Sequence, residues 1–201
     1  MSPERSSREN GPTIRNPMNA PPCAEFITAV PMSMIMDISL RRKHLTLVKT
    51  THKETLLKAQ KSYVKIGKLR RRPQYRIYSE KGKELIVSCD KNHRWIITWP
   101  NQPHKEYWLV EHSRYCDAVF SNALEEGIRV GLGRNSPITN MTTGKVLATA
   151  HRKGLWRRRV LMTMDKDVDV VLMTAFIIAT SEIHECQAAA ANLGHYAGGG
   201  R

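Results

Sequence analysis

One segment near the C-terminus restricts the possible fold of this chain more than any other. Residues 168–183, VDVVLMTAFIIATSEI, are apolar on nearly every side from Val170 to Ala179. The run is too short to span a membrane, which takes about 20 apolar residues. A helix without a polar side must be surrounded by protein. A buried strand is the alternative, because β-branched residues are frequent here, but sixteen residues is long for a strand.

Acidic residues flank this segment on both sides. Asp165, Asp167 and Asp169 stand before or within its start, and Glu182 and Glu185 lie at its end. Aspartates complement the positive end of a helix dipole, so they favour a helix that begins here. Alternating aspartates can also ligate Ca²⁺, but the glycine and the distal glutamate of an EF-hand loop are missing. We therefore interpret the three aspartates as a helix start.

The residues before this helix have a period of two instead. Apolar and polar residues alternate in short runs separated by Gly, Asn or Pro, which predicts β-strands. Trp95, Ile97 and Trp99 share one face of such a run, a pattern more typical of a core than of a binding surface. Residues 135–137 (Asn-Ser-Pro) read as a turn. The predicted strands are residues 75–78, 85–87, 94–99, 106–110, 118–120, 127–130, 145–150 and 159–164, the first four forming two hairpins.

Short strands joined by polar turns favour an antiparallel sheet that closes on itself. Wrapping that sheet around the apolar helix covers every side of the helix. We therefore predict an α+β fold, a mostly antiparallel β-barrel wrapped around a hydrophobic C-terminal helix. With 201 residues, 41% of them hydrophobic, the chain fits one domain, which we place at residues 33–186. Residues 1–32 are predicted to be a disordered arm and residues 187–201 a flexible tail.

The stretch at residues 53–70 allows two interpretations. On a helical wheel, Leu56, Leu57, Tyr63 and Val64 share one side, and the lysines share the other. This arrangement predicts a basic amphipathic helix. Tyr63 and Val64 equally suit a strand, so helix and strand both remain open for this region.

Positive charge is concentrated in two segments. The chain has a formal net charge of +14, and residues 41–76 contain thirteen Lys or Arg against one acid, Glu54. Residues 145–159 contain six Lys or Arg and no acid. Clustered positive charge attracts polyanions, so phosphate is the expected chemical target. The candidate phosphate- or lipid-binding residues are Lys58, Lys61, Lys65, Lys68, Arg70, Arg71, Arg72, Arg152, Lys153, Arg157, Arg158 and Arg159.

Two kinds of polyanion fit this charge. An anionic phospholipid or phosphoinositide surface suits a basic amphipathic stripe, because each basic residue near such a surface contributes about 1 kcal/mol. RNA or DNA fits as well, because aromatic residues interleaved with arginine can stack on bases. Lys and Arg runs are also common on ordinary solvated surfaces or in localisation signals. The aromatic candidates for stacking are Trp95, Trp99, Tyr107, Trp108 and Trp156.

Three stretches also carry a likeness to a known family. Residues 75–87 (YRIYSEKGKELIV) resemble an early hairpin, residues 144–153 (GKVLATAHRK) a late hairpin strand, and residues 167–183 a final helix of the LURP-one-related proteins in the tubby C-terminal-like superfamily. The order and spacing of these stretches matter more than their individual residues. The resemblance implies a closed barrel threaded by a C-terminal helix, and a link to phosphoinositides and membranes.

Signs of catalysis are weak in this sequence. No HExxH, GxSxG or paired Cys and His spacing is present, and the glycines around Leu132 lack the rest of a dinucleotide-binding motif. The polar N-terminus lacks the apolar core of a signal peptide. We expect a non-enzymatic monomer without a cofactor or small-molecule substrate, located in the cytoplasm and in addition at a membrane surface or in the nucleus.

Overall fold

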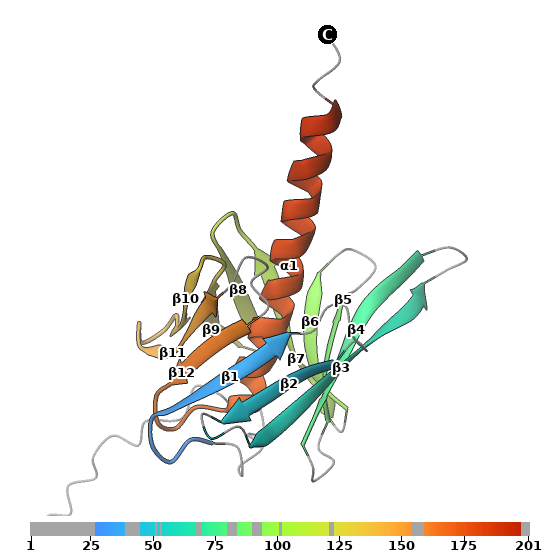
Figure 1. Cartoon of the computed structure of the whole chain (residues 1–201). Coiled ribbons are helices and arrows are strands. Elements are labelled where there is room, and N and C mark those ends of the chain that lie inside the picture. Colours follow the sequence, from blue (N-terminus) through green and yellow to red (C-terminus); the bar gives the residue numbers. More distant parts are fainter. Residues whose placement is uncertain are drawn as a thin grey trace, which may run out of the picture.

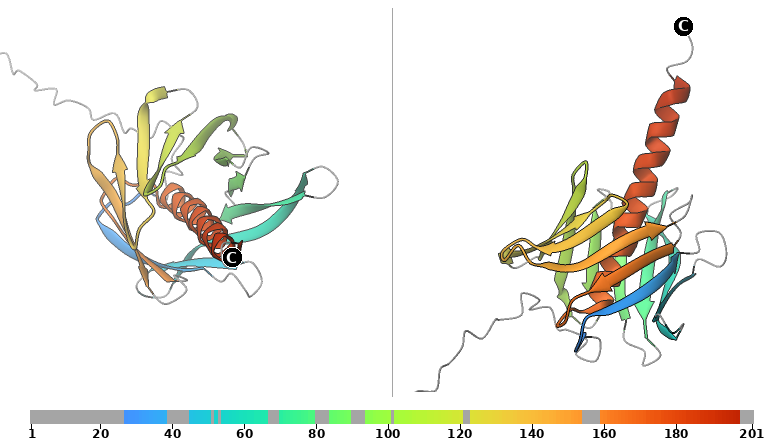
Figure 2. Two further views of the ribbon diagram at one scale, coloured as in Figure 1. Left: turned by 90° about the horizontal axis from the view of Figure 1, so that it is seen from above. Right: turned by 60° about the vertical axis from the view of Figure 1, so that its left-hand side comes forward.

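A long helix lies along the axis of the molecule, and strands surround it (Figure 1). The computed structural model describes residues 27–38, 45–50, 52, 54–66, 70–79, 84–89, 94–100, 102–120, 123–153 and 159–197. Helix α1 (Val170–Ala197) is buried throughout residues 170–180. Seen from above, the strands form a ring with α1 inside it (Figure 2).

Twelve strands in the described part of the chain form a closed barrel. Each strand pairs antiparallel with its neighbours in sequence, and β1 pairs with β12 to close the ring. The predicted α+β fold, a barrel wrapped around a C-terminal helix, is confirmed. The strands are β1 (Met32–Ile38), β2 (Leu45–Thr50), β3 (Thr55–Ile66), β4 (Arg70–Tyr78), β5 (Glu84–Cys89), β6 (Trp95–Trp99), β7 (Gln102–Glu111), β8 (Tyr115–Phe120), β9 (Ala123–Gly131), β10 (Asn135–Asn140), β11 (Val146–Lys153) and β12 (Arg159–Met164).

The core lies between the inner face of the barrel and α1. Side chains along a strand alternate between its two faces, so every second residue points inward. In β6 this places Trp95, Ile97 and Trp99 in the core, as the alternation predicted. On α1, Phe176 is fully buried, and its ring meets the ring of Tyr107 edge-on, with 5.6 Å between the centroids. The sheet therefore covers the apolar helix on all sides.

The start of α1 is fixed by two short polar side chains. Asp169 is the N-cap, because its Oδ1 accepts hydrogen bonds from the backbone N–H of Val171 (2.8 Å) and of Leu172 (3.0 Å). Thr28, from the N-terminal part of the chain, forms hydrogen bonds with the residues just before this helix. Its Oγ1 donates to the carbonyl of Asp165 (2.6 Å) and accepts from the N–H of Val168 (3.0 Å). The interpretation of the aspartates as a helix start is thus confirmed at Asp169.

The described residues of the stretch 53–70 do not form a helix, which corrects the helical interpretation. Apart from Glu54, they belong to β3 and to the first residue of β4. Leu57 and Ala59 are buried as alternate residues of a strand. Pairing with β2 on one side and β4 on the other outweighs the local helical pattern.

Two smaller expectations also change. Residues 135–137 open strand β10 and do not form a turn. A proline is tolerated there because β9 pairs only with Ile138–Asn140, which leaves one edge of Pro137 unpaired. Helix α1 continues to Ala197, beyond residue 183, where the apolar sequence pattern ended.

The up-and-down topology gives the barrel two distinct rims. The C-terminal ends of the odd-numbered strands and the N-terminal ends of the even-numbered strands meet at one rim. The C-terminal part of α1 leaves the barrel there (Figure 1), so we call it the exit rim. The opposite rim, where Thr28 meets the start of α1, is called the base rim.

Shortening Phe176 should test the packing of α1 inside the barrel. Phe176→Ala leaves a cavity between α1 and Tyr107 and should lower the free energy of unfolding by about 3–5 kcal/mol in urea titrations. Phe176→Leu leaves a smaller cavity and should cost less. A loss no larger than that of Val146→Ala, a change at an exposed position, would contradict the buried placement of α1.

Candidate functional site

Exposed basic side chains gather at the exit rim. Lys65 lies near the C-terminal end of β3, and Arg71 lies near the N-terminal end of β4. Lys153 is the last residue of β11, and Arg159 is the first residue of β12. Turns of three further hairpins add one arginine each. We call these exposed residues the rim cations: Lys65, Arg71, Arg94, Arg114, Arg134, Lys153 and Arg159.

Backbone hydrogen bonds hold neighbouring turns of this rim in a fixed relation. The carbonyl of Arg114 accepts from the N–H of Leu132 (3.0 Å), and the carbonyl of Arg134 accepts from the N–H of Arg152 (2.9 Å). Each turn is thus tied to the next hairpin around the barrel. The rim cations of these turns therefore occupy a rigid frame rather than free loops.

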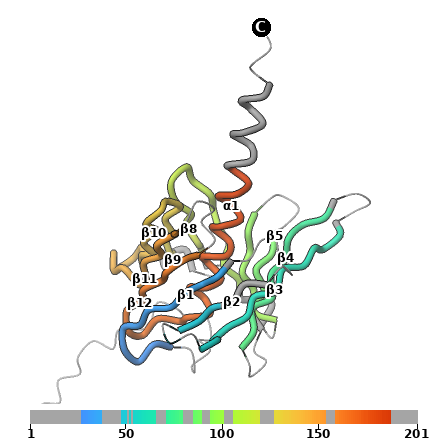
Figure 3. Tube along the Cα trace, in the orientation of Figure 1, coloured from blue at the N-terminus to red at the C-terminus, as the bar shows by residue number. Residues whose placement is uncertain are grey.

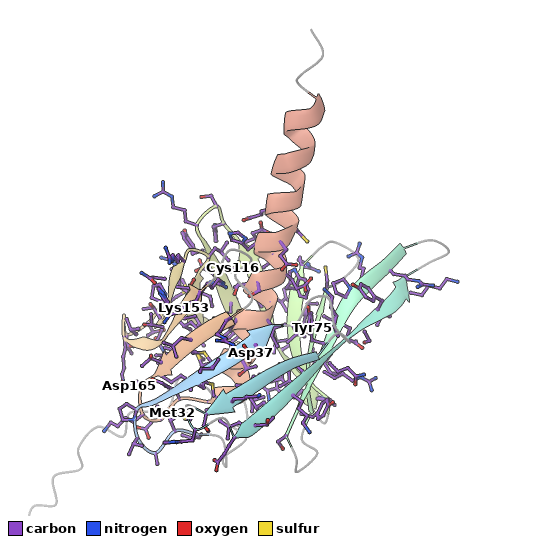
Figure 4. The ribbon with its side chains drawn as sticks, in the orientation of Figure 1. Met32, Asp37, Tyr75, Cys116, Lys153 and Asp165 are labelled. Atoms are coloured by element: carbon purple, nitrogen blue, oxygen red, sulfur yellow. The ribbon has the colours of Figure 1, made fainter. Side chains whose placement is uncertain are left out.

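The base rim has a different charge balance. Lys145 pairs there with Asp165 at 2.8 Å, and the hydrogen bond from Lys145 lowers the pKa of the Asp165 carboxyl. Lys166 and Asp167 are exposed beside them. Figure 4 labels one residue of each rim on the left of the barrel, Lys153 above and Asp165 below. Acids are present at both rims in the described residues, with Asp37 and Glu111 at the exit rim, but there the exposed cations outnumber them.

Lys61 was predicted to bind lipid, but it points into the barrel. Its Nζ donates to Oε1 of Glu182 on α1 at 2.6 Å, and its side chain is only 12% exposed. The hydroxyl of Tyr75 donates to the same carboxylate oxygen, from the side of β4 that faces α1 (Figure 4). Lys61 Nζ also lies 5.4 Å from the centroid of the Tyr75 ring. We call Lys61, Tyr75 and Glu182 the buried ionic cluster.

Arg152 is a second predicted lipid ligand with a structural position. It is 3% exposed. Its Nη1 donates to the carbonyl of Gly133 (3.1 Å) and to Oγ of Ser136 (2.5 Å), and its Nη2 donates to Oγ1 of Thr180 on α1 (3.1 Å). The guanidinium thus connects the turn after β9 with the central helix. A buried charge held in this way is not available to a lipid surface.

Two more candidates depart from the predicted exposed stripe. Arg72 is buried, with Nη1 4.0 Å from Sγ of Cys89. Lys58 lies on the opposite face of β3 from Lys61 and Lys65, because strand positions alternate with a period of two rather than 3.6. The single lysine face expected from a helix therefore does not exist.

The other predicted residues have different outcomes. Lys65, Arg71, Lys153 and Arg159 are exposed at the exit rim, and Arg159 pairs with Asp37 at 3.0 Å. Arg70 is the first residue of β4. Lys68, Arg157 and Arg158 lie outside the described residues.

Sequence reasoning missed Arg94, Arg114 and Arg134. Each is the sole arginine of its stretch, so no charge run drew attention to it. Their regular spacing of 20 residues is the signal that could have found them, since one hairpin plus its turns spans that length here. A search for basic residues that recur with the hairpin period would have identified this rim.

Most of the aromatic residues that the sequence suggested for base stacking are buried inside the barrel. Trp95, Trp99 and Tyr107 are buried in the core. Trp108 is 38% exposed, but the guanidinium of Arg94 lies over its ring, 4.8 Å from the centroid. Trp156 lies outside the described residues. Of the four described candidates, only Trp108 is exposed, while Tyr63, which was not a candidate for stacking, is 50% exposed.

Neither a metal centre nor a spanning helix is found in the described residues. No group of three or more His, Cys, Asp or Glu side chains there could hold a metal ion. None of the helical residues described forms a stretch long and apolar enough to cross a membrane. Burial and the charge of Glu111 raise the pKa of the Cys116 thiol to about 12, so this thiol stays protonated and unreactive at neutral pH.

Comparison with known proteins gives a fold relationship. No protein family matches the sequence, and no curated protein matches it significantly. The crystal structure of a protein from Arabidopsis thaliana is similar, with a TM-score of 0.58. The two chains share 14% sequence identity over 79% of this chain and 94% of the plant protein. At this identity the similarity establishes a shared fold.

Breaking the buried ionic cluster should destabilise the protein. Lys61→Met leaves the Glu182 carboxylate in the barrel without its cation, which should cost about 2 kcal/mol or more of unfolding free energy. The double variant Lys61→Met/Glu182→Gln removes that isolated charge and should be more stable than Lys61→Met. Urea unfolding measures both. A loss as small as that of Lys58→Met, on the other face of β3, would contradict the cluster.

Alkaline pH should weaken the fold through Tyr75. Burial, followed by the charge of Glu182, raises the pKa of Tyr75 well above its usual range. Both states hold the phenolic proton below about pH 10, so stability there does not depend on this group. Above that pH the unfolded chain loses the proton first, and the free energy of unfolding falls. In unfolding titrations from neutral to alkaline pH, Tyr75→Phe should flatten this decline, whereas Tyr78→Phe should not.

Proposed function

We propose that this protein docks on anionic membranes through its exit rim and that it binds phosphoinositides or other anionic phospholipids without catalysing a reaction. The gathering of the rim cations on one end of the barrel is the observation that carries the proposal. Each basic residue near an anionic surface contributes about 1 kcal/mol, so several of them acting together can hold a protein there.

The rigid frame of the rim supports docking on an extended surface. The turns that carry Arg114 and Arg134 are tied to neighbouring hairpins by backbone hydrogen bonds. A turn whose backbone is already ordered loses little backbone freedom on binding, which favours affinity. The exit rim also has acids, Asp37 and Glu111, but its larger number of exposed cations would orient the barrel with α1 leaving toward the membrane.

The positions of the aromatic residues that the sequence suggested for base stacking favour lipid over nucleic acid. Proteins that bind single strands stack bases on exposed rings. Trp95, Trp99 and Tyr107 are buried, and the Trp108 ring is covered on one side by Arg94. Nucleic-acid binding through the same cations remains the alternative that the experiment below separates.

The fold supports a family assignment as part of this proposal. The plant protein with the similar structure is a LURP-one-related protein. The sequence stretches at residues 75–87, 144–153 and 167–183 occupy a β-hairpin, a late strand and the central helix in this barrel, as the resemblance implied. We therefore propose that the chain is a tubby-like, LURP-one-related barrel that acts as a monomeric peripheral membrane protein inside the cell.

Charge reversal at two linked turns tests the function. Arg114→Glu/Arg134→Glu should weaken binding to phosphatidylcholine vesicles that contain phosphatidylserine and phosphatidylinositol bisphosphate. Removing two cations alone costs about 2 kcal/mol, or roughly 30-fold in affinity, and the added acids increase the loss. Vesicle sedimentation at near-physiological salt measures the affinity.

The matched control is Lys166→Glu at the base rim, which should bind vesicles almost as well as the wild type. A parallel titration with mixed single-stranded RNA separates the two polyanions. Binding to RNA that survives physiological salt, together with weak vesicle binding, would contradict the membrane proposal and support the nucleic-acid alternative.

A further inference from the structure

The hairpin of β3 and β4 extends beyond the barrel wall at the exit rim. Among the described residues, strand β3 pairs with β2 as far as Gln60, and β4 pairs with β5 from Gln74 onward. Residues 61–66 pair with residues 70–75, and the last four pairs, 63–66 with 70–73, lie past both of these points. Figures 1 and 3 show the hairpin reaching out from the barrel at the upper right. We call residues 61–66 and 70–73 the projecting ribbon.

Two cations stand directly opposite each other on this ribbon. Lys65 and Arg71 are cross-strand partners in the β3–β4 register, and both are exposed. Directly opposed residues lie on the same face with Cβ atoms about 4.5–5.5 Å apart, and like charges in such a pair destabilise a sheet. An anion bound between them would remove this repulsion. The pair is therefore unfavourable in the free protein and favourable in a complex with an anion.

The chemistry of the pair fits a phosphate group. The planar guanidinium of Arg71 can donate two parallel hydrogen bonds to phosphate oxygens, and the ammonium of Lys65 adds a compact charge. Together they carry two positive charges, which match the charge of about −1.5 to −2 on a phosphomonoester at neutral pH.

The residues beside the pair suit a lipid headgroup region rather than a protein surface. Tyr63 is 50% exposed and Val64 is 43% exposed. They are consecutive in β3, so they point to opposite faces of the ribbon. A protein partner would cover one face, whereas the interfacial region of a bilayer can surround both. Tyrosine, with an apolar ring and a polar tip, is favoured in that region.

The buried ionic cluster fixes the base of the ribbon. Lys61 of β3 and Tyr75 of β4 both bind the Glu182 carboxylate of α1. The Nζ of Lys61 also lies 5.6 Å from the centroid of the Tyr63 ring. The base of the ribbon is therefore held against the central helix at Lys61 and Tyr75, which lie four residues from Lys65 and Arg71 in their strands.

We propose that Lys65 and Arg71 form a phosphate clamp that binds a phosphomonoester on a membrane lipid, while Tyr63 and Val64 enter the headgroup region on either side of the ribbon. This inference rests on the proposed membrane function and specifies which lipid phosphate the protein selects and where.

The test compares vesicles of equal surface charge, one set with phosphatidylserine alone and one with phosphatidylinositol bisphosphate replacing part of it. The wild type should prefer the second set. Arg71→Gln should lose about tenfold or more in affinity for it and should lose the preference, as expected for a charge-assisted hydrogen bond. Arg76→Gln, on the same strand within the barrel wall, is the matched control and should retain the preference.

Two further readouts separate the parts of the proposal. Without ligand, Arg71→Gln should raise the urea midpoint slightly, because it removes the like-charge pair. Val64→Ser should weaken vesicle binding several-fold without changing the binding of soluble inositol trisphosphate, because the lost contact is with lipid.

The outcomes are distinguishable. If the wild type binds all anionic vesicles equally and Arg71→Gln behaves like Arg76→Gln, the clamp is wrong and the membrane function stands. If the wild type binds no vesicles at physiological salt, the membrane function fails and the lipid clamp fails with it. Binding of soluble inositol trisphosphate alone, with no effect of Val64→Ser on any readout, would overturn the lipid as the source of the phosphate.

Discussion

The structure depends on burying an apolar helix that has no polar side. Val170 to Thr180 are all buried, so the sheet must close around them completely, and the buried hydrophobic residues described in the chain form one core. Of the described buried polar side chains, Trp99 Nε1 and Thr174 Oγ1 lack a hydrogen-bond partner, whereas the charged ones are paired. The buried ionic cluster and Arg152 each link the barrel wall to α1 above its apolar section. These contacts are all near the exit rim, so the features that hold the helix also set the geometry of the proposed binding surface.

The topology of the barrel brings basic residues that are dispersed in the sequence together on one surface. In an up-and-down barrel, alternate turns fall on the same rim, so cations that lie far apart in sequence become neighbours in space. Arg94, Arg114 and Arg134 follow this hairpin period, while the base rim has acids next to its lysines. Membrane attraction then acts on one end of the molecule. The projecting ribbon adds directional chemistry to this attraction, because its paired strands present two cations and two apolar side chains at defined positions.

The sequence predicted the barrel and the helix because their signals are local and strong. Alternation along Trp95, Ile97 and Trp99 and the apolar run after Asp169 each specify one element without reference to the rest. The positions of individual cations could not be predicted in this way. Lys61 and Lys65 look alike in sequence, yet Lys61 points at Glu182, 121 residues further along the chain, and Lys65 is exposed. The two lysines lie on the same face of β3, so the difference is decided by where along the hairpin the pairing with β2 and β5 ends and by the path of α1. Arg152 was misassigned for the same reason.

Hydrogen exchange on the intact protein, with and without vesicles containing phosphatidylinositol bisphosphate, tests the central claim most directly. If the exit rim docks on the membrane, vesicles should slow amide exchange in the turns at residues 112–114 and 132–134 and in the projecting ribbon, while the base rim at residues 141–145 and 165–168 stays unchanged. Slower exchange at the base rim, or no change at either rim under conditions where the protein sediments with the vesicles, would contradict the account.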